Sequence, residues 1–558
     1  MNQIINKIFN KIFKAAMASK AFKQNRLQAQ SLASMLENES QTWENVKRSA
    51  IGGKRILIAT SMGCYEHGTL VESALSIALT LRGARVSFLL CDQSLPCCQM
   101  IKIYNIAPED LLTQEHTPRC DECVKQGEDA FQFLGLPILR FGDWISDADA
   151  DEACRLSESL HIEDIPKYVY REVAVGEHAM AGALRFFARG DLEDEPFGEK
   201  ILRRYLKASM LTASAMGNVL AKHRFDAAVF NHGIYVPQGI IGEVLRREGI
   251  RVVNWNPSYR KQTFIFSHDD TYHRTMITEP TNLWERMPWD FQKEKVILDY
   301  LKSRRYGTQD WIWFHDKPYE DLDRIQQELG IDFNEPCIGL LTSVMWDAQL
   351  HYRSNAFRNM LEWMVYTIEY FRKRPDLKLL ARIHPAEIHG LIPSRQKMLD
   401  AIQQRIQKYP PNITLVPPES RISTYALMQK CNAVIIYNTK TGIEISCMGI
   451  PVIVAGEAWI RGKGFSIDVN SPEEYLEVLD RLPLPHRLSP EQLLRARKYA
   501  YHFFFRRMIE LPFLVPIRKH KIGLMLNSLR QLEPGVFPGL DVVCRGILDG
   551  SPFIVEKY

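Results

Sequence analysis

A histidine followed by a proline stands at the end of an apolar run in the second half of the chain. His384 and Pro385 directly follow the run Leu-Lys-Leu-Leu-Ala-Arg-Ile. Pro385 restricts the backbone of His384 to an extended conformation. An imidazole held in this way at the end of a strand could contact a phosphate or a leaving group. The same dipeptide would also fit an ordinary turn that carries a structural histidine.

A second polar turn follows the apolar run Ala-Val-Ile-Ile. It contains Asn438, Thr439, Thr441 and Gly442, and Glu444 comes one turn into the helix that the next residues predict. Free N–H groups at a helix N-terminus attract phosphate, and threonine hydroxyls add hydrogen-bond donors. Glu444 could accept hydrogen bonds from ribose hydroxyls. The alternative is an ordinary N-cap followed by an acidic residue in the first turn.

Two further loops carry charged residues that could meet a ligand. Asp347 comes shortly after the apolar run Cys-Ile-Gly-Leu-Leu, where a donor sugar or an interdomain cleft is expected. Lys463 lies between Gly462 and Gly464 and could close on a diphosphate or an acidic sugar. The alternatives are a capping aspartate beside a packed tryptophan and a solvated surface turn.

A group of cysteines falls in the first quarter of the chain. Cys91, Cys97 and Cys98 are followed by the Cys-x2-Cys pair Cys120 and Cys123. Cys91, Cys97, Cys120 and Cys123 could form a structural zinc site, because zinc in structural sites is bound by four such ligands. An iron–sulfur cluster uses the same ligand type. Separate thiols, some of them buried as small apolar residues, are the third interpretation.

Parallel strands must hold these loops in place. Residues 54–60, 84–91, 225–231 and 250–255 are apolar runs separated by helical patterns, which predicts β–loop–α–β units and a first α/β domain over residues 51–280. Residues 281–335 predict a helical linker.

A second series of apolar runs predicts another doubly wound domain over residues 336–484. Residues 485–558 are expected to form a helical C-terminal tail. Two doubly wound domains in tandem imply a central cleft, and ligands bind beyond the carboxyl ends of their strands.

The N-terminal residues 1–50 predict a basic amphipathic helical extension. Within residues 2–30, apolar side chains at helical spacing lie opposite lysines, which suits the surface of an anionic bilayer. The alternative is a helix packed on the body of the protein. No apolar run is long enough to predict a membrane-spanning helix.

Composition limits the class of protein and its partners. The 558 residues include 70 Lys and Arg and 66 Asp and Glu, a balance too even for a dedicated nucleic-acid-binding protein. Eleven cysteines are too few for a disulfide scaffold. We therefore expect a cytoplasmic protein with no nucleic-acid partner, peripheral on the inner face of the cell membrane if residues 1–30 bind it.

The order of the motifs resembles a known family. His384-Pro385, the turn from Asn438 to Glu444, the sequence Gly-Ile-Pro-Val and the Gly-Lys-Gly-Phe loop resemble bacterial capsule and lipopolysaccharide glycosyltransferases of the GT-B fold. They look most like the capsule polysaccharide biosynthesis group, to which CMP-Kdo-using transferases belong. The resemblance covers residues 336–480 best and implies transfer of a sugar from a nucleotide sugar, CMP-linked in that group, to a surface-polysaccharide or lipid-linked acceptor.

The same resemblance implies roles for individual residues. His384 would contact the nucleotide phosphates, Glu444 would hold the ribose, and Thr439, Thr441 and Gly442 would form the phosphate-binding turn. Such enzymes often carry two small hydroxyl residues in this turn, whereas this chain has Lys440 within it, so the identity of the donor stays open. GT-B catalysis usually requires no metal cofactor.

The general base is expected on a loop of the first domain. Glu66 and His67 are the first choice because they follow the first strand, which ends centrally in a doubly wound sheet. Asp92, His232 and Asp269 are the other candidates. Two further functions share the predicted architecture: a non-hydrolysing nucleotide-sugar epimerase, and a non-catalytic polysaccharide-assembly protein.

Overall fold

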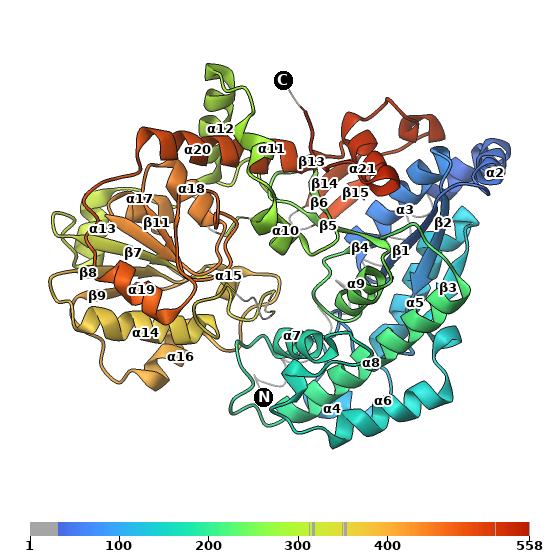
Figure 1. The fold of residues 1–558 in the computed structure, drawn as a ribbon, viewed down its shortest axis with the longest axis horizontal. Coiled ribbons are helices and arrows are strands. Elements are labelled where there is room, and N and C mark those ends of the chain that lie inside the picture. The colour runs from blue at the N-terminus through green and yellow to red at the C-terminus, as the bar shows by residue number, and fades with distance from the viewer. Residues whose placement is uncertain are drawn as a thin grey trace, which may run out of the picture.

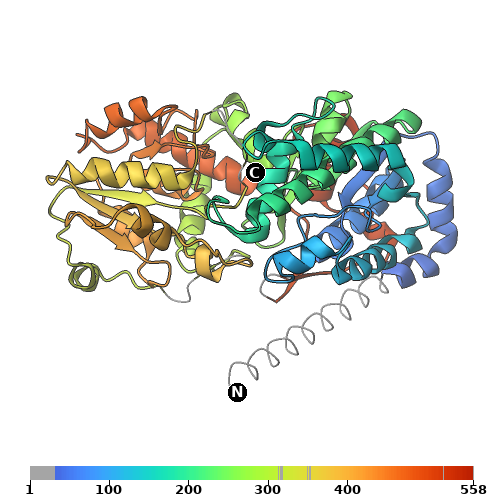
Figure 2. The ribbon, with the colours of Figure 1, turned by 90° about the horizontal axis from the view of Figure 1, so that it is seen from below.

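The computed structural model describes residues 32–311, 313–314, 318–348, 350, 354–518 and 521–556. These residues form two lobes, each built around one β-sheet with helices on both faces (Figure 1). The lobes lie side by side along the long axis of the molecule (Figure 2). The amphipathic helix and the membrane contact predicted for residues 1–30 lie outside the described residues.

The sheet of the N-terminal domain has the strand order β13-β6-β5-β4-β1-β2-β3. Its five strands from β5 to β3 are parallel, whereas β6 runs antiparallel to both β5 and β13. The strands are β1 (Arg55–Ser61), β2 (Arg85–Leu90), β3 (Ile138–Arg140), β4 (Ala227–Asn231), β5 (Arg251–Pro257), β6 (Thr263–His268) and β13 (Met508–Glu510).

Both faces of this sheet are buried because successive residues of each strand point to opposite sides. Ile56 and Ile58 of β1 pack in one core with α3 and α21, and Leu57 and Ala59 pack in a second core with α7, α8 and α9. The domain contains α2 (Ser40–Ser49), α3 (Glu66–Leu81), α4 (Pro108–Thr113), α5 (Pro118–Phe131), α6 (Asp147–Ser159), α7 (Val175–Phe187), α8 (Gly198–Lys222), α9 (Gln238–Arg247) and α10 (Tyr272–Thr278).

The predicted helical linker is present in the described residues. It consists of α11 (Asn282–Glu285), α12 (Phe291–Arg304) and α13 (Leu322–Leu329). Asp290 caps α12 and Asp321 caps α13, each by accepting a hydrogen bond from the backbone N–H three residues later. Arg304, the last residue of α12, reaches the C-terminal domain.

The C-terminal domain has six parallel strands in the order β12-β11-β10-β7-β8-β9. They are β7 (Cys337–Leu341), β8 (Lys378–Arg382), β9 (Ile413–Val416), β10 (Ala433–Ile436), β11 (Val452–Val454) and β12 (Ile467–Asp468). This is the strand order of a Rossmann-like sheet, and it reverses between β7 and β10. The loops after these two strands therefore meet at the position where doubly wound sheets bind ligands.

Helices cover both faces of the second sheet as well. Ile338 and Leu340 of β7 pack against α14, α16 and α19, whereas Cys337 and Leu341 pack on the side of α17, α18 and α20. The helices are α14 (Met360–Arg372), α15 (Ala386–His389), α16 (Met398–Arg405), α17 (Thr424–Gln429), α18 (Thr441–Cys447), α19 (Pro472–Leu479) and α20 (Pro490–Tyr501).

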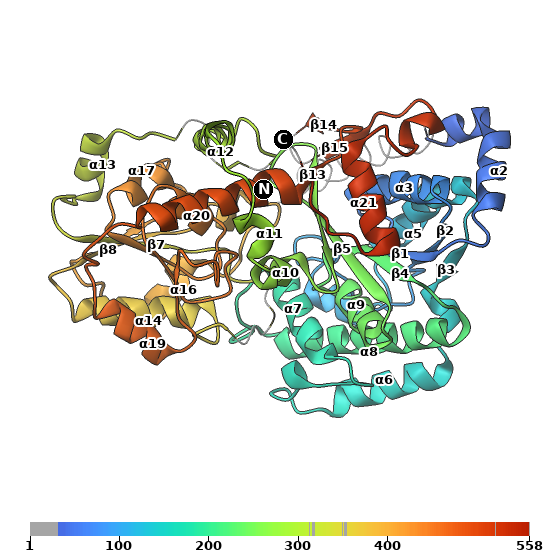
Figure 3. The same cartoon turned by 45° about the horizontal axis from the view of Figure 1, so that its top comes forward.

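The C-terminal segment returns to the first domain. After α20, a π-helical stretch (His502–Arg507) leads into β13, which joins the N-terminal sheet beside β6 (Figure 3). The hairpin of β14 (Leu514–Arg518) and β15 (Lys521–Leu524) follows, and then α21 (Pro538–Asp549). The expected helical tail is therefore helical only in part, because its apolar run from Met508 onwards completes the first sheet and its core.

The predicted architecture of two doubly wound α/β domains is confirmed. Each has a parallel sheet with the Rossmann-like reversal of strand order, between β1 and β4 in the first and between β7 and β10 in the second. In the part of the chain that the structure describes, none of the helices combines the length and the apolar character needed to cross a bilayer.

Candidate active site

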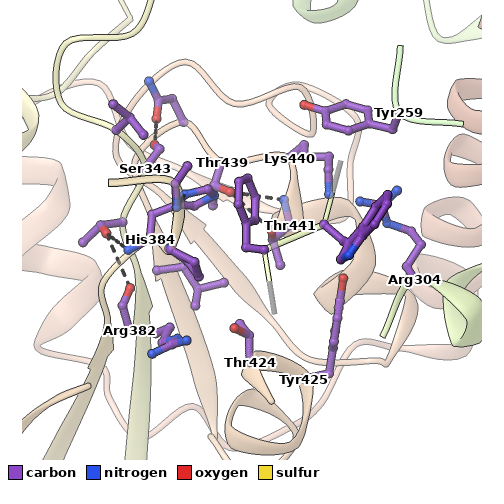
Figure 4. Close-up of a pocket in the computed structure, with 18 of the residues that line it drawn as sticks. Tyr259, Arg304, Ser343, Arg382, His384, Thr424, Tyr425, Thr439, Lys440 and Thr441 are labelled. Carbon is purple, nitrogen blue, oxygen red and sulfur yellow. Dashed lines mark hydrogen bonds between the residues drawn. The ribbon is translucent and has the colours of Figure 1, made fainter. Parts of the chain in front are cut away.

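A cavity of about 410 Å³ lies where the two domains meet. Its lining includes residues of the loops after β7, β8 and β10, together with Tyr259 from the N-terminal domain (Figure 4). His273, also from the N-terminal domain, belongs to the lining as well. The volume is within the range of small-molecule and cofactor sites, about 300–1,000 Å³. The cavity thus occupies the crevice at which the strand order of the second sheet reverses.

His384 presents a neutral imidazole to this cavity. Its backbone N–H donates to Oγ1 of Thr342 at 2.9 Å, and its Nδ1 accepts from the N–H of Ala386 at 3.1 Å. Because Nδ1 is an acceptor, the ring proton resides on Nε2. Burial, with the charges of Lys440 and Arg382, lowers the pKa of His384 to about 4. The imidazole is therefore a neutral hydrogen-bond donor at pH 7.

The turn after β10 adds hydroxyl groups beside His384. Thr439 and Thr441 both line the cavity, and Oγ1 of Thr439 donates to Oγ1 of Thr441 at 3.3 Å. Oγ1 of Thr439 also accepts the backbone N–H of Thr441 at 3.4 Å. Ser343, in the loop after β7, donates to the side-chain oxygen of Asn438 and ties the two loops together. The predicted residues His384, Pro385, Asn438, Thr439, Thr441 and Asp347 all line this one cavity.

A buried network of charges lies behind the turn. Nε of Arg304 is 3.1 Å from Oε1 of Glu444, and the same carboxylate accepts hydrogen bonds from Lys440 and the hydroxyl of Tyr425. Arg304 also pairs with Asp310, at 2.6 Å between Nη1 and Oδ2. Arg304 comes from the linker, so the network fastens α12 to the start of α18.

The pKa values show which partner dominates this network. Burial alone would raise the pKa of Glu444, but the charges of Arg304 and Lys440 lower it to about 2. Burial and the charge of Arg304 lower the pKa of Lys440, and Glu444 acts in the opposite direction. Arg304 is therefore the principal partner of Glu444, and Lys440 is the second. The nitrogen of Lys440 also lies 4.7 Å from the centre of the Tyr259 ring, at the wall of the cavity.

The lining of the cavity also includes an imidazole and a carboxylate, those of His273 and Asp347. His273, on α10, packs against the rings of Tyr272 at 4.1 Å and Trp459 at 5.6 Å between centroids. Burial lowers the pKa of His273 to about 4, and the nearby Asp347 acts in the opposite direction. Oδ1 of Asp347 accepts a hydrogen bond from the hydroxyl of Tyr235 at 3.0 Å. His273 is thus a neutral base near the carboxylate of Asp347, in the lining of the same cavity as His384.

The comparisons with known proteins give only distant matches. No protein-family model and no curated protein matches the chain. Among solved structures, it is similar to the beta Kdo 2,4 transferase KpsC of Thermosulfurimonas dismutans, with 14% identity and a TM-score of 0.35 over 55% of this chain and 87% of that one.

Two other solved structures are similar over more of the chain. The UDP-GlcNAc 2-epimerase of Neisseria meningitidis has 10% identity and a TM-score of 0.24, over 80% of this chain and 95% of that one. The family 9 glycosyl transferase of Veillonella parvula has 11% identity and a TM-score of 0.20, over 80% and 97%. At these values the likeness carries no functional argument, and the function is inferred from the residues of the cavity.

The two residues predicted first as the general base, Glu66 and His67, lie away from this cavity. Glu66 and His67 do not line it, and the carboxylate of Glu66 lies 2.9 Å from Nζ of Lys521 on β15. The C-terminal hairpin, which the sequence did not reveal, supplies this partner. The carboxylate of Asp92 accepts the N–H of Gly142 at 3.1 Å, and neither Asp92 nor Asp269 lines the cavity.

His232 is the remaining candidate from the sequence, and it lies close to His273. It follows β4, and its backbone has a φ of 69°, in the left-handed region that non-glycine residues rarely adopt. The centroid of its ring is 6.1 Å from that of His273. Burial and the charges of His273 and Arg185 hold the pKa of His232 well below its ordinary value.

Three predicted nucleotide-binding residues have structural partners here. Lys463 is buried, and its nitrogen donates to the carbonyls of Ile277 and Glu279, each at 2.9 Å. Because these carbonyls end α10, Lys463 ties the two domains together and does not line the cavity. A side chain at Gly442 would meet Ile436 and Ile460, so this glycine serves close packing. Glu444 is taken up by the charge network, and its contact with a ribose stays a prediction.

The cysteines do not assemble as the predicted set of four. Cys91, Cys120 and Cys123 line a small pocket together with Cys64 and Cys98, whereas Cys97 packs into the domain core. Among the described residues, no three His, Cys, Asp or Glu side chains are arranged to hold a metal ion. Cys98 lines the pocket, whereas its neighbour Cys97 is buried in the core and contributes to packing.

Proposed function

We propose that this protein is a glycosyltransferase that moves a sugar from a nucleotide sugar to an acceptor held between its two domains. The observation that carries the proposal is the presence of two groups of residues in the lining of one cavity. His384, Thr439 and Thr441 supply neutral hydrogen-bond donors from the loops of the second sheet. His273, from the N-terminal domain, and Asp347, from the loop after β7, add a base and a carboxylate to the same lining.

The donor side would bind the phosphate of the nucleotide sugar. Nε2–H of His384 and the hydroxyls of Thr439 and Thr441 can donate hydrogen bonds to phosphate oxygens. Lys440, at the wall of the cavity, adds positive charge close to them. As the sugar–phosphate bond breaks, negative charge grows on the leaving nucleotide, and donors already in place stabilise it without reorganisation.

The acceptor side would activate a hydroxyl group. Neutral His273 can take the proton of an acceptor hydroxyl while that oxygen attacks the anomeric carbon of the donor. Asp347, close to His273, stabilises the imidazolium that results. One bond forms to the acceptor oxygen and one breaks to the nucleotide phosphate, so the proposed reaction is a single displacement with inversion.

The resemblance of the motifs to capsule polysaccharide transferases supports the finer assignment. We take the donor to be CMP-linked and the acceptor to be a surface polysaccharide or its lipid-linked precursor. Residues 1–30, with lysines opposite apolar side chains, would hold the enzyme at the membrane surface where such an acceptor lies.

Replacing His384 by alanine tests the donor site directly. We expect the variant to bind the nucleotide about tenfold to a hundredfold more weakly, because a hydrogen bond to a charged phosphate is worth about 1.5–3 kcal/mol. The measurement is thermal unfolding with CMP, UDP and GDP in separate samples. A nucleotide at about 100 times its dissociation constant should stabilise the wild-type protein by about 2.7 kcal/mol.

The matched control is His486→Ala, which removes an exposed histidine of the same domain that does not line the cavity. It should leave the nucleotide-induced shift unchanged. Equal shifts in His384→Ala and the wild type would contradict the proposed donor site. If the protein converted a nucleotide sugar to its epimer without any acceptor, its function would be epimerisation and the proposed transfer would be wrong.

A further inference from the structure

A second cluster of cations lies beside the cavity, on the edge of the N-terminal domain. It consists of Lys102, Arg185 and, at its exposed rim, Arg119. The loop after β2 brings them together by two backbone hydrogen bonds. The N–H of Gln99 donates to the carbonyl of Val236 at 2.9 Å, and the N–H of Ile103 donates to the carbonyl of Phe186 at 3.0 Å.

These two bonds determine the neighbours of Lys102. Phe186 is adjacent to Arg185 on α7, and Val236 is adjacent to Tyr235 in the loop after β4. Lys102 therefore lies between α7 and the carboxyl end of β4, the central region of the first sheet. Ligands of doubly wound sheets bind at this end of the strands.

Arg185 is held by aromatic rings, and no acidic side chain of the described residues forms an ion pair with it. Its guanidinium carbon lies 4.9 Å from the centre of the Tyr235 ring and 5.9 Å from that of Trp346. Its Nε is buried and makes no hydrogen bond to the residues that the structure describes. Stacking on rings fixes the plane of the guanidinium and leaves its N–H groups available for a planar or tetrahedral anion.

Among the described residues, Arg119 at the rim interacts with the thiol of Cys64 and with Glu122, whereas Arg185 is in contact with aromatic rings. Burial, together with the charges of Arg185 and Arg119, lowers the pKa of Lys102 to about 8, and the nearby Cys64 acts in the opposite direction. Half-buried cations that repel one another cost free energy unless an anion joins them. Arg304, a cation of the cavity lining, is by contrast paired with Glu444 and Asp310. The contrast between Arg304 and Arg185 points to a ligand as the counter-charge of Arg185.

The cluster adjoins the donor cavity through one side chain. Tyr235 stacks on Arg185, and its hydroxyl donates a hydrogen bond to Asp347. Asp347 in turn lines the cavity. Arg185 is therefore joined to the cavity lining through Tyr235 and Asp347, and the acceptor of the proposed reaction would lie on this side.

We propose that Arg185 and Lys102 form a binding subsite for an anionic group of the acceptor, a carboxylate of an acidic sugar or a phosphate. The subsite selects acidic acceptors over neutral ones and holds the reactive hydroxyl near His273. This inference rests on the proposed transferase function for the identity of the ligand as acceptor. Binding of the anion itself does not depend on transfer.

The test measures binding to the full-length protein by ligand-observed NMR. The probes are methyl glucuronoside for the carboxylate, glucose 6-phosphate for the phosphate, and methyl glucoside as the neutral analogue. We expect one or both acidic probes to bind and the neutral one to bind at least about tenfold more weakly, as expected for loss of one charged contact. Which acidic probe binds more tightly identifies the source of the anion.

Arg185→Met and Lys102→Gln should each weaken the acidic probe by about tenfold or more while leaving the nucleotide-induced thermal shift intact. Met keeps apolar contact with the rings of Tyr235 and Trp346, so packing is retained. Lys102 is half-buried in a loop, and Lys102→Gln keeps a side chain of similar length, so it provides a second variant if Arg185→Met unfolds. The control is Lys167→Gln, an exposed lysine of the same domain.

The outcomes separate this inference from the proposed function. Nucleotide binding without discrimination between acidic and neutral probes overturns the subsite and leaves the donor site standing. If the protein binds the acidic probes but no nucleotide, the anion subsite stands and the proposed donor site is overturned. Loss of the nucleotide shift in Arg185→Met or Lys102→Gln would assign the cations to the donor site and would also overturn the acceptor subsite.

Discussion

Replacement of His273 by alanine is expected to lower the turnover number by about 10²–10⁴-fold, the usual contribution of a general base. His273 faces the cavity from the N-terminal domain, is neutral at pH 7, and lies near the carboxylate of Asp347. Without it, the attacking hydroxyl would have to lose its proton to water. The measurement is the initial rate of transfer at saturating donor and acceptor.

A structural role for His273 would give a different pattern. If the side chain only packs against Tyr272 and Trp459, the isosteric His273→Asn variant should recover much of the rate. For a general base, asparagine restores nothing because it cannot accept the proton. The nucleotide-induced thermal shift should be the same in all three proteins, which shows that the donor site is intact.

Asp347→Asn provides the second arm of this experiment. We expect a smaller loss than in His273→Ala, because asparagine retains an oxygen for the hydroxyl of Tyr235 but carries no charge to stabilise an imidazolium. The effects of the two substitutions should not add in the double variant, since both act on one proton transfer. Full turnover in His273→Ala would instead direct attention to His232, whose ring is 6.1 Å away.

The fold could be predicted largely because its signals are local. Each parallel strand is a short apolar run between a turn and a helical pattern, and nearly all expected runs in the two domains are strands in the structure. The loops that follow β7, β8 and β10 also had to meet, because carboxyl ends of parallel strands share one edge of the sheet. His384, Asn438 and Thr441 were found together for this reason.

Other features depend on contacts between distant segments. The partner of Glu444 is Arg304, which comes from the linker 140 positions earlier, so the sequence around Glu444 could not distinguish a ribose contact from an ion pair. Glu66 is occupied by Lys521 of a hairpin that read as part of a helical tail. In both cases the local motif was visible, but its partner was encoded elsewhere.

His273 had a weak signal in the sequence. The stretch Ser-His-Asp-Asp-Thr-Tyr-His follows an apolar run, and Asp269 was considered within it. The chain turns at Asp269, where φ is 64°, and α10 then carries His273 to the cavity. Proximity in sequence to the end of a strand is therefore a less reliable guide than the direction of the helix that follows it.

The largest expected effect on stability comes from Glu444. Replacing Glu444 by alanine should lower the free energy of unfolding of the C-terminal domain by about 3–5 kcal/mol, as is usual when one partner of a buried ion pair is removed. Arg304 and Lys440 would be left buried without this carboxylate. The measurement is urea unfolding, and the control is the exposed Glu477→Ala, which should change stability by less than about 0.5 kcal/mol.

The pH dependence of stability distinguishes a buried ion pair of Glu444 from a contact of Glu444 with a ribose. The pKa of Glu444 is about 2 in the folded protein and 4.5 in the reference state of an exposed glutamate. A depressed folded-state pKa stabilises the protein above pH 4.5, and the stabilisation is lost as pH falls from 4.5 towards 2. The stability difference between the wild type and Glu444→Ala should therefore be constant near neutrality and shrink across this range. If Glu444 served mainly to hold a ribose, the substitution would weaken nucleotide binding with little change in stability at any pH, because its charge would then contribute only when the ligand is bound.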